Sequence, residues 1–152
     1  MIRVQEEDFD VGIELSKMTD EHFGIGAQSC FIGLVRDMAN QEHISAMTLE
    51  HYPGMTEKQL RKIEKEANQR WPLNDVLIIH RFGKLQPGDR IVLVATTSAH
   101  RRAAIESCHF LIDWLKTKAP FWKVESSLSG DSWVEAQDND EREAKKWETE
   151  NT

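Results

Sequence analysis

Residues 98–123 read SAHRRAAIESCHFLIDWLKTKAPFWK, and this stretch determines the fold around it. Its apolar side chains recur at helical spacing between two cationic ends. That pattern predicts an amphipathic helix over residues 100–118, which ends before Pro120. Ser98 is the expected N-cap. The expected core stripe of this helix is Ala104, Cys108, Leu111 and Leu115, widened by Ile105 and Ile112.

Outward from this helix, a second one is predicted over residues 56–71, because Leu60, Ile63 and Ala67 form one apolar stripe. Thr56 is its expected N-cap. Residues 83–89, GKLQPGD, are expected to form a loop or turn. The remaining expected elements are strands at 2–5, 27–35 (buried), 43–51, 76–82, 91–97, 121–128 and 133–134, a helix at 9–18 with Asp10 as N-cap, and a polar turn at 40–42.

The order of these elements predicts the fold class. Helices and strands mix without strict βαβ alternation, which favours an α+β fold with a mixed or antiparallel sheet packed against helices. The chain of 152 residues suits a single domain, residues 1–152, with a charged helical tail at about residues 138–148. We expect a cytoplasmic protein with no membrane partner, because no apolar run resembles a signal peptide or a membrane span. Cys30 and Cys108 are expected to be reduced and buried.

Charge is distributed unevenly along the chain. Residues 100–123 hold five Lys or Arg against two acidic residues, whereas the whole chain carries a net charge of −7. A positive segment in an acidic protein predicts a site for a small anion and no nucleic-acid partner, since long nucleic acid needs a broad basic face. His100 and Arg101 lie where free backbone N–H groups at a helix start bind phosphate or carboxylate. Surface arginines that reach solvent or a neighbouring acid explain this spacing equally well.

Further cations lie at the other end of the helix and after a strand. Lys116 and Lys118 suit the negative end of the helix dipole without any catalytic role. Lys123 lies in the apolar run FWKV, where aromatic neighbours would desolvate it and make it a usable base or nucleophile, although position alone favours a structural role. Arg36 follows the strand at 27–35 and forms either a surface ion pair with Asp37 or an anion clamp.

No motif indicates a metal or an organic cofactor, and neither is expected. The chain lacks the GxxxxGK[ST], HExxH and GxSxG patterns, and its histidines lack metal-ligand spacing. The GIG run at residues 24–26 precedes a strand, whereas a dinucleotide loop follows one, so we interpret it as a turn. Any chemistry is therefore expected to depend on cationic side chains.

Six segments form a distinctive set: FIGLVR (31–36), LEHYPGM (49–55), HRFGKLQPGD (80–89), SAHR (98–101), LKTKAPFWK (115–123) and WVEA (133–136). Together they resemble the large, catalytic subunit of molybdopterin synthase, in the order and spacing of that family. The resemblance implies a hammerhead-like α/β core with a small β subdomain. It also implies a sulfurtransferase of molybdenum cofactor biosynthesis, which converts cyclic pyranopterin monophosphate to molybdopterin by inserting the dithiolene sulfurs.

The resemblance further implies partners and site residues. Each sulfur arrives as a thiocarboxylate on the C-terminal glycine of a small ubiquitin-like sulfur-carrier subunit. The large subunits form a homodimer, with one small subunit at each end of a heterotetramer. Gln137 stands where some members carry a substrate-site arginine, and Arg142 is not assumed to replace it. By motif, Lys116 and Lys123 match the catalytic lysines, Arg36, His100 and Arg101 match substrate-binding residues, and Phe31 matches a pocket-lining position.

Helix length adds a prediction about the assembly. Arg101 and Lys116 lie on one predicted helix, separated by roughly 22 Å along its axis. A single small pterin cannot contact both residues in the same copy. We therefore expect His100 and Arg101 of one subunit to complete a site with Lys116 and Lys123 of the other.

Two other function classes fit part of the sequence. A noncatalytic scaffold would keep the fold and leave the cations idle, but the presence of both Lys116 and Lys123 argues against it. An RNA- or nucleotide-binding module would use the basic helix start. The net charge of −7 and the lack of a wide basic face argue against that module.

Overall fold

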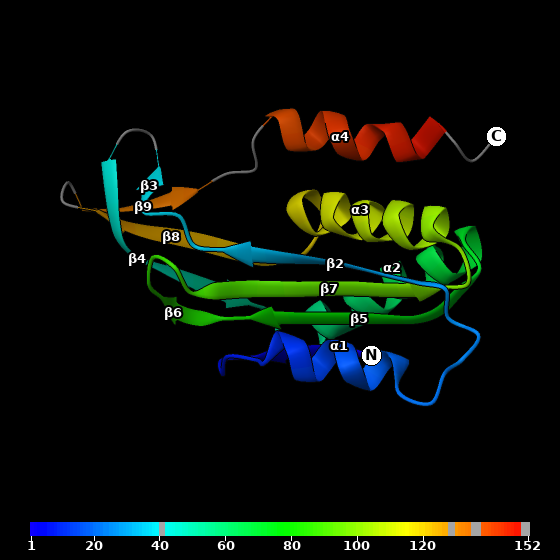
Figure 1. Ribbon diagram of the computed structural model, residues 1–152. Coiled ribbons are helices and arrows are strands. Elements are labelled where there is room, and N and C mark those ends of the chain that lie inside the picture. The colour runs from blue at the N-terminus through cyan, green and yellow to red at the C-terminus, as the bar shows by residue number, and fades with distance from the viewer. Residues whose placement is uncertain (40–41, 128–129, 135–137, 150–152) are drawn as a thin grey trace.

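The computed structural model describes residues 1–39, 42–127, 130–134 and 138–149. Figure 1 shows a central sheet with helices on both of its faces and a second sheet beyond one end of its strands. The predicted α+β class with mixed and antiparallel sheets is confirmed. None of the described helices is long and apolar enough to cross a membrane.

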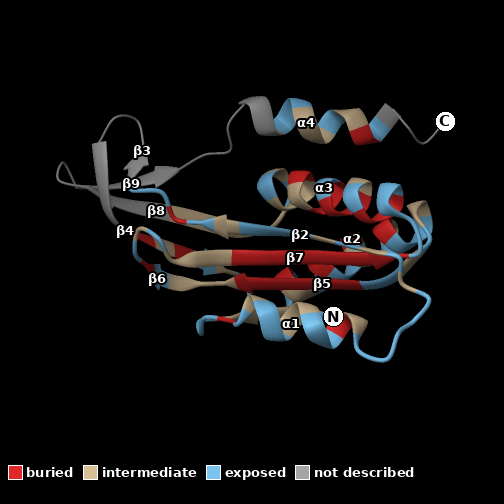
Figure 2. Cartoon of the chain, viewed as in Figure 1, coloured by how far each residue is buried: buried red, intermediate tan, exposed pale blue. Residues whose placement is uncertain are grey.

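The central sheet has four strands in the order β1-β5-β7-β2. The strand β1 pairs parallel with β5, and the other pairs are antiparallel. The two inner strands are apolar along most of their length because both of their faces are covered (Figure 2). The bounds are β1 Ile2–Gln5, β5 Leu73–Arg81, β7 Arg90–Ser98 and β2 Ala27–Leu34.

Alternation along β5 divides the core between the two faces of this sheet. Leu77 and Ile79 join the cluster under α1 (Val11–Thr19). Val76 and Ile78 join the cluster on the opposite face, which includes residues of α2 (Met55–Arg70) and α3 (Arg101–Thr117). The side chain of Asp10 accepts a hydrogen bond from the backbone of α1, as predicted for its N-cap.

The second sheet contains five strands and is antiparallel. Its strand order is β3-β4-β8-β9, and β6 also pairs with β4. The prediction of a loop over 83–89 is therefore wrong for its first residues: they form β6, because Leu85 is fully buried against Val35, Met47 and Leu49. The bounds are β3 Met38–Ala39, β4 Glu42–His51, β6 Gly83–Leu85, β8 Phe121–Ser127 and β9 Gly130–Val134.

The predicted C-terminal helix is present as α4 (Asp138–Thr149), and it packs against the outer side of the helical layer (Figure 1). Trp147 is buried, with ring centroids 5.7 Å from Trp71 and 5.6 Å from Phe110. Its indole N–H donates to the Asp113 carboxylate at 2.7 Å, and Arg70 donates to its carbonyl at 2.9 Å. These contacts make α4 part of the core.

Burial of the strand at 27–35 was predicted, and the structure contradicts it for most of β2. This strand forms an edge of the central sheet, and Ile32 and Leu34 remain exposed. Cys30 is exposed as well, whereas Cys108 is buried as expected, and both thiols are free. The sequence pattern indicated a strand correctly but could not show that it lies at an edge.

Two of the predicted helix caps and one predicted core residue are also wrong. Gly54 caps α2, while Thr56 is buried and its hydroxyl accepts from the Tyr52 N–H at 3.1 Å. His100 is the N-cap of α3, although the hydroxyl of Ser98 still accepts its backbone N–H at 3.3 Å. Ile105 is 58% exposed. It follows Ala104 directly, so its side chain is rotated roughly 100° about the helix axis away from the buried stripe. These differences depend on local backbone geometry, which the residue types do not fix.

We expect Trp147→Ala to lower the free energy of unfolding by about 3–5 kcal/mol, since it empties a buried aromatic site and leaves the Asp113 carboxylate without its donor. Urea denaturation measures this change. Lys145→Ala, an exposed position on the same helix, is the control and should change little. A Trp147→Ala protein as stable as the control would show that α4 adds nothing to the core.

Candidate functional site

Two predicted catalytic lysines converge at one end of α3. Lys116 is exposed in the last turn of α3, which carries it beyond the buried stripe. Lys123 is half-buried in β8, where it pairs with Leu49 of β4. Both ammonium groups lie close enough to His80 to lower the pKa of its imidazole. The chain therefore reverses direction at Pro120, and α3 and β8 each supply one lysine to the same cationic site.

The His80 imidazole is neutral at physiological pH. Burial is the main cause that lowers its pKa to about 4, and electrostatic interactions with Lys123, His51 and Lys116 lower it further. Its hydrogen bond to the Arg81 carbonyl acts in the opposite direction, but the other causes outweigh it. The site thus contains two lysines close to the uncharged imidazole of His80.

Aromatic rings form one wall of this region. The ring of Phe121 stacks on His80, with centroids 3.7 Å apart and planes inclined by 14°. His51 lies 4.5 Å from the Phe82 ring, and its Nδ1 lies 3.2 Å from the hydroxyl of Thr56. From the sequence, His80 was noted only as lacking metal-ligand spacing, and His51 was not singled out. Their role depends on the pairing of β4 with β8, which no local pattern reveals.

Arg36 lies at the same end of the molecule. It is exposed just after β2, which runs in the same direction as α3 because both are antiparallel to β7. Backbone hydrogen bonds of Val35 fix this strand end: its N–H donates to Asp89 at 3.0 Å, and its carbonyl accepts from Gly88 at 2.8 Å. Lys116, Lys123 and Arg36 therefore belong to one end of a single copy.

His100 and Arg101 lie at the opposite end of α3 (Figure 1). Both are exposed, and α3 has no acidic residue in its first turn and no side-chain hydrogen bond from its N-cap. This helix start can therefore receive an anion. Arg102 instead donates to the Glu106 carboxylate at 2.7 Å, so the surface interpretation holds for that arginine. One copy does not bring His100 and Arg101 to the two lysines.

Exposed apolar residues are present on β2 and on α3. Phe31 is 37% exposed in the middle of β2, on the face that carries α3. Ile105 lies exposed on the side of α3 that is turned away from α2. The predicted pocket residue Phe31 is thus accessible to solvent in a single copy.

Gln137 and Arg142 were also discussed from the sequence. Gln137 lies outside the residues that the structure describes. Arg142 is exposed on α4, and it contributes no described contact to Lys116 or Lys123. No described contact of Arg142 assigns it the role of the family arginine, and that role is still not assumed.

Within the described part of the chain, one group of three residues could offer ligands to a metal. The ligand atoms of His109, Asp113 and Glu143 lie within 4.8 Å of one another. The ammonium of Lys146 lies 2.6 Å from Glu143 and 3.6 Å from Asp113. Burial opposes its charge, but these carboxylates outweigh that effect and raise the pKa of Lys146. The cluster is therefore an ion-pair network that ties α4 to α3.

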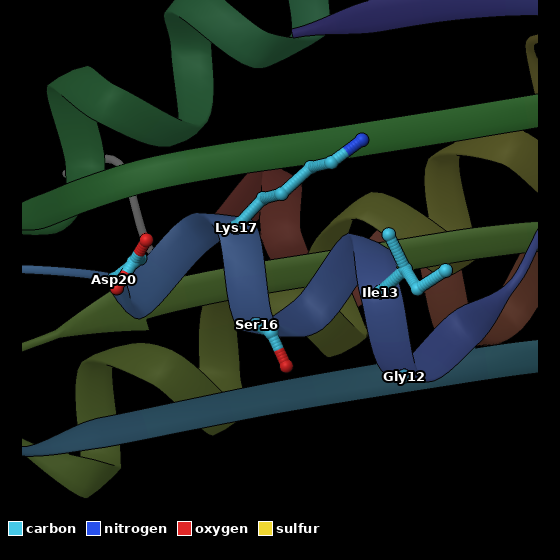
Figure 3. A pocket seen from close by; sticks show the side chains of 5 residues that line it. All are labelled: Gly12, Ile13, Ser16, Lys17 and Asp20. Carbon is cyan, nitrogen blue, oxygen red and sulfur yellow. The ribbon is translucent and has the colours of Figure 1, made fainter.

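A hollow of about 390 Å³ lies along the outer side of α1 (Figure 3). It lies on α1, which covers the face of the central sheet opposite to α3, and its charged groups are one lysine and one aspartate. Its lining offers no convergent set of groups for the predicted chemistry. The lining residues are Gly12, Ile13, Ser16, Lys17 and Asp20.

Known proteins match this chain over nearly its full length. The MoaE protein family matches residues 4–118. The molybdopterin synthase catalytic subunit of Pseudomonas aeruginosa is 51% identical over 147 residues, which cover 97% of this chain and 98% of that protein. The solved MoaE protein from Burkholderia ambifaria has a TM-score of 0.83 at 49% identity and covers 97% of both chains. Molybdopterin synthase from Staphylococcus aureus has a TM-score of 0.81 at 31% identity, covering 88% of this chain and 96% of that one.

The lowered pKa of His80 predicts a pH dependence of stability. Between pH 6.5 and about 4 the unfolded chain protonates this histidine while the folded protein keeps it neutral, so acid favours unfolding. We expect wild type to lose roughly 3 kcal/mol more than His80→Gln over this window. Urea titrations at several pH values measure the difference, with exposed His22→Gln as the control. Equal losses in wild type and His80→Gln would show that His80 titrates normally.

Proposed function

The chain belongs to the MoaE protein family, and on that premise we propose that it is the catalytic subunit of a molybdopterin synthase, which transfers sulfur to cyclic pyranopterin monophosphate. The observation that carries the proposal is the convergence of Lys116 and Lys123 on a buried neutral histidine. Two cations beside an uncharged ring suit a reaction in which negative charge develops.

The sulfur donor must be a second protein, because this chain offers no suitable thiol. Cys108 is buried, and burial is the main cause that raises the pKa of its thiol to about 11. Cys30 is exposed on the edge strand and has no described contact to either lysine. A catalytic subunit, as the Pseudomonas relative is named, also implies another subunit. We assign this role to a small ubiquitin-like carrier with a C-terminal thiocarboxylate.

The transfer consumes water, which releases the carrier. The thiocarboxylate sulfur attacks a side-chain carbon of the pterin, so a C–S bond forms while a C–O bond of that carbon breaks and the oxygen leaves with its electron pair and takes up a proton. Water then cleaves the bond between the acyl carbon and sulfur, so the carrier leaves with a carboxylate and the sulfur stays on the product. Lys116 and Lys123 stabilise the developing negative charge and move the protons that these steps require. Repetition with a second carrier completes the dithiolene.

The pterin phosphate needs its own cations, which we assign to Arg36, His100 and Arg101. A guanidinium fork and free helix-start N–H groups bind phosphate oxygens well. Phe31 then lines the pocket beside the pterin. The helix length separates Arg101 from Lys116 by roughly 22 Å, so one small substrate reaches both only if two copies share it.

The surface of α3 supports such a shared site. At roughly 100° per residue, Arg101 and Lys116 project about 60° apart around the axis, with Ile105 and Ile112 between them along the same side. These four positions are symmetric about the middle of the helix. A two-fold axis there would set Arg101 of one copy opposite Lys116 of the other and would cover the exposed edge of β2. We therefore propose a homodimer with two composite sites, and a carrier at each end.

The rest of the assignment concerns the whole chain. We propose that residues 1–152 form one domain, since α4 packs its Trp147 into the core of α2 and α3. The exposed free thiol of Cys30 suits a reducing compartment, and we propose the cytoplasm.

We expect Lys116→Ala to reduce pterin conversion by about 100-fold or more, because it removes a cation that contacts the reacting groups. Its melting temperature should stay near that of wild type, since the side chain is exposed. The matched control is Lys118→Ala, which removes an exposed lysine that faces Glu148 at 3.6 Å. Near-normal turnover by Lys116→Ala would contradict the assignment.

The shared site predicts complementation between inactive variants. After subunit exchange, a dimer of Arg101→Ala with Lys116→Ala has one site with both defects and one intact site. Activity should return toward half of the wild-type level per mixed dimer. A mixture of Lys116→Ala with Lys123→Ala is the control and should stay inactive, because both lysines come from the same copy. Failure of the first mixture, with exchange verified by native mass spectrometry, would exclude the shared site.

A further inference from the structure

His80 is a buried titratable group to which the proposed reaction gives no task. It lies near the end of β5, paired with Val4 of β1 and Val92 of β7, and is only 8% exposed. Alternation along β5 places it on the face that carries Val76 and Ile78, beneath the helical layer. Residues of this kind are buried at a cost unless they are hydrogen-bonded, so the position calls for a reason.

The hydrogen bond of His80 defines its tautomer. Its Nδ1 lies 2.8 Å from the Arg81 carbonyl oxygen, which can only accept, so Nδ1 carries the proton and donates it. Nε2 of the neutral ring therefore carries no proton. Lys123 on β8, Lys116 on α3 and His51 on β4 all oppose a positive charge on this ring. The imidazole is held in one orientation and one charge state.

The stacked ring of Phe121 connects His80 to the lysines. Phe121 begins β8, and its N–H donates to the Ala119 carbonyl at 2.8 Å in the turn that follows α3. Phe121 and Lys123 are alternate residues of one strand, so they point to the same face. A flat ring held against His80 therefore fixes the start of the strand that carries Lys123. Since α3 is anchored separately by its core stripe, this contact acts together with the pairing of β8 with β4 to set the distance between Lys123 and Lys116.

We propose that His80 is a positioning residue for the sulfur-transfer site: as an uncharged ring stacked on Phe121, it holds Lys123 in register with Lys116 and adds no third cation between them. The inference rests on the proposed function, because the register of the lysines matters only if they act on the reacting groups. A protonated or missing ring would let the start of β8 move, and two like charges would then separate.

The test compares His80→Ala with His80→Phe, which keeps a flat uncharged ring against Phe121 but loses the Nδ1 donor. With thiocarboxylated carrier in excess, His80→Ala should lower kcat by about 10- to 100-fold, since a small misplacement of a reacting group has effects of this size. KM for the pterin should change by less than about twofold, because the phosphate cations are untouched. His80→Phe should recover most of kcat. His22→Ala, an exposed histidine, is the control.

Phe121→Leu provides an independent arm if His80→Ala does not fold. It leaves His80 in place and removes the stacked ring, so it should lower kcat to a similar extent with KM kept. The double variant His80→Ala with Phe121→Leu should be no worse than the worse single variant, since both remove the same contact.

Several results would overturn the proposal. Unchanged kcat in Phe121→Leu, or equal losses in His80→Ala and His80→Phe, would show that the stack does not position Lys123. A rise in KM with kcat kept would place His80 in substrate binding instead. If wild type transfers no sulfur in the same assay, the proposed function fails, and that outcome is distinct from a failure of the positioning role.

Discussion

The packing of α3 on the central sheet is the constraint on which the rest of the structure depends. Its buried stripe, from Ala104 to Leu111, fixes both the rotation and the position of the helix against β7 and β2. A rigid helix then holds Arg101 and Lys116 at a separation that no side-chain motion can close. The proposed division of the site between two copies follows from this length. The same packing leaves the edge of β2 open to a second copy.

The second sheet contributes the other half of one cationic end. Pairing of β4 with β8 places Phe121 beside His51 and against His80, and it places Lys123 two residues further along the same face. Burial of His80 costs the protein stability in acid, yet it supplies a neutral, rigid ring where two lysines meet. The protein is therefore less stable at low pH, while the positions of the two lysines relative to His80 are fixed.

The sequence predicted much of this structure, and its errors have physical causes. The two main helices were found because Leu60 and Ile63 repeat at helical spacing in one of them. Cys108 and Leu111 do so in the other, and all four residues are buried. Local periodicity cannot show which strand lies at an edge, so Ile32 was wrongly expected in the core. It also cannot show strand pairing across long separations, so the role of His80 opposite Phe121 was not predicted. The two lysines were found by resemblance to a family, while spacing alone favoured ordinary surface charges.

One measurement tests the central claim, that this chain moves sulfur from a carrier to a pterin at its cationic site. The thiocarboxylated carrier is mixed with the chain and cyclic pyranopterin monophosphate, and its intact mass is followed by mass spectrometry. The mass of the carrier should fall by the difference between a sulfur and an oxygen atom, and only when both chain and pterin are present. A carrier that keeps its sulfur, or that loses it equally without the pterin, would contradict the account.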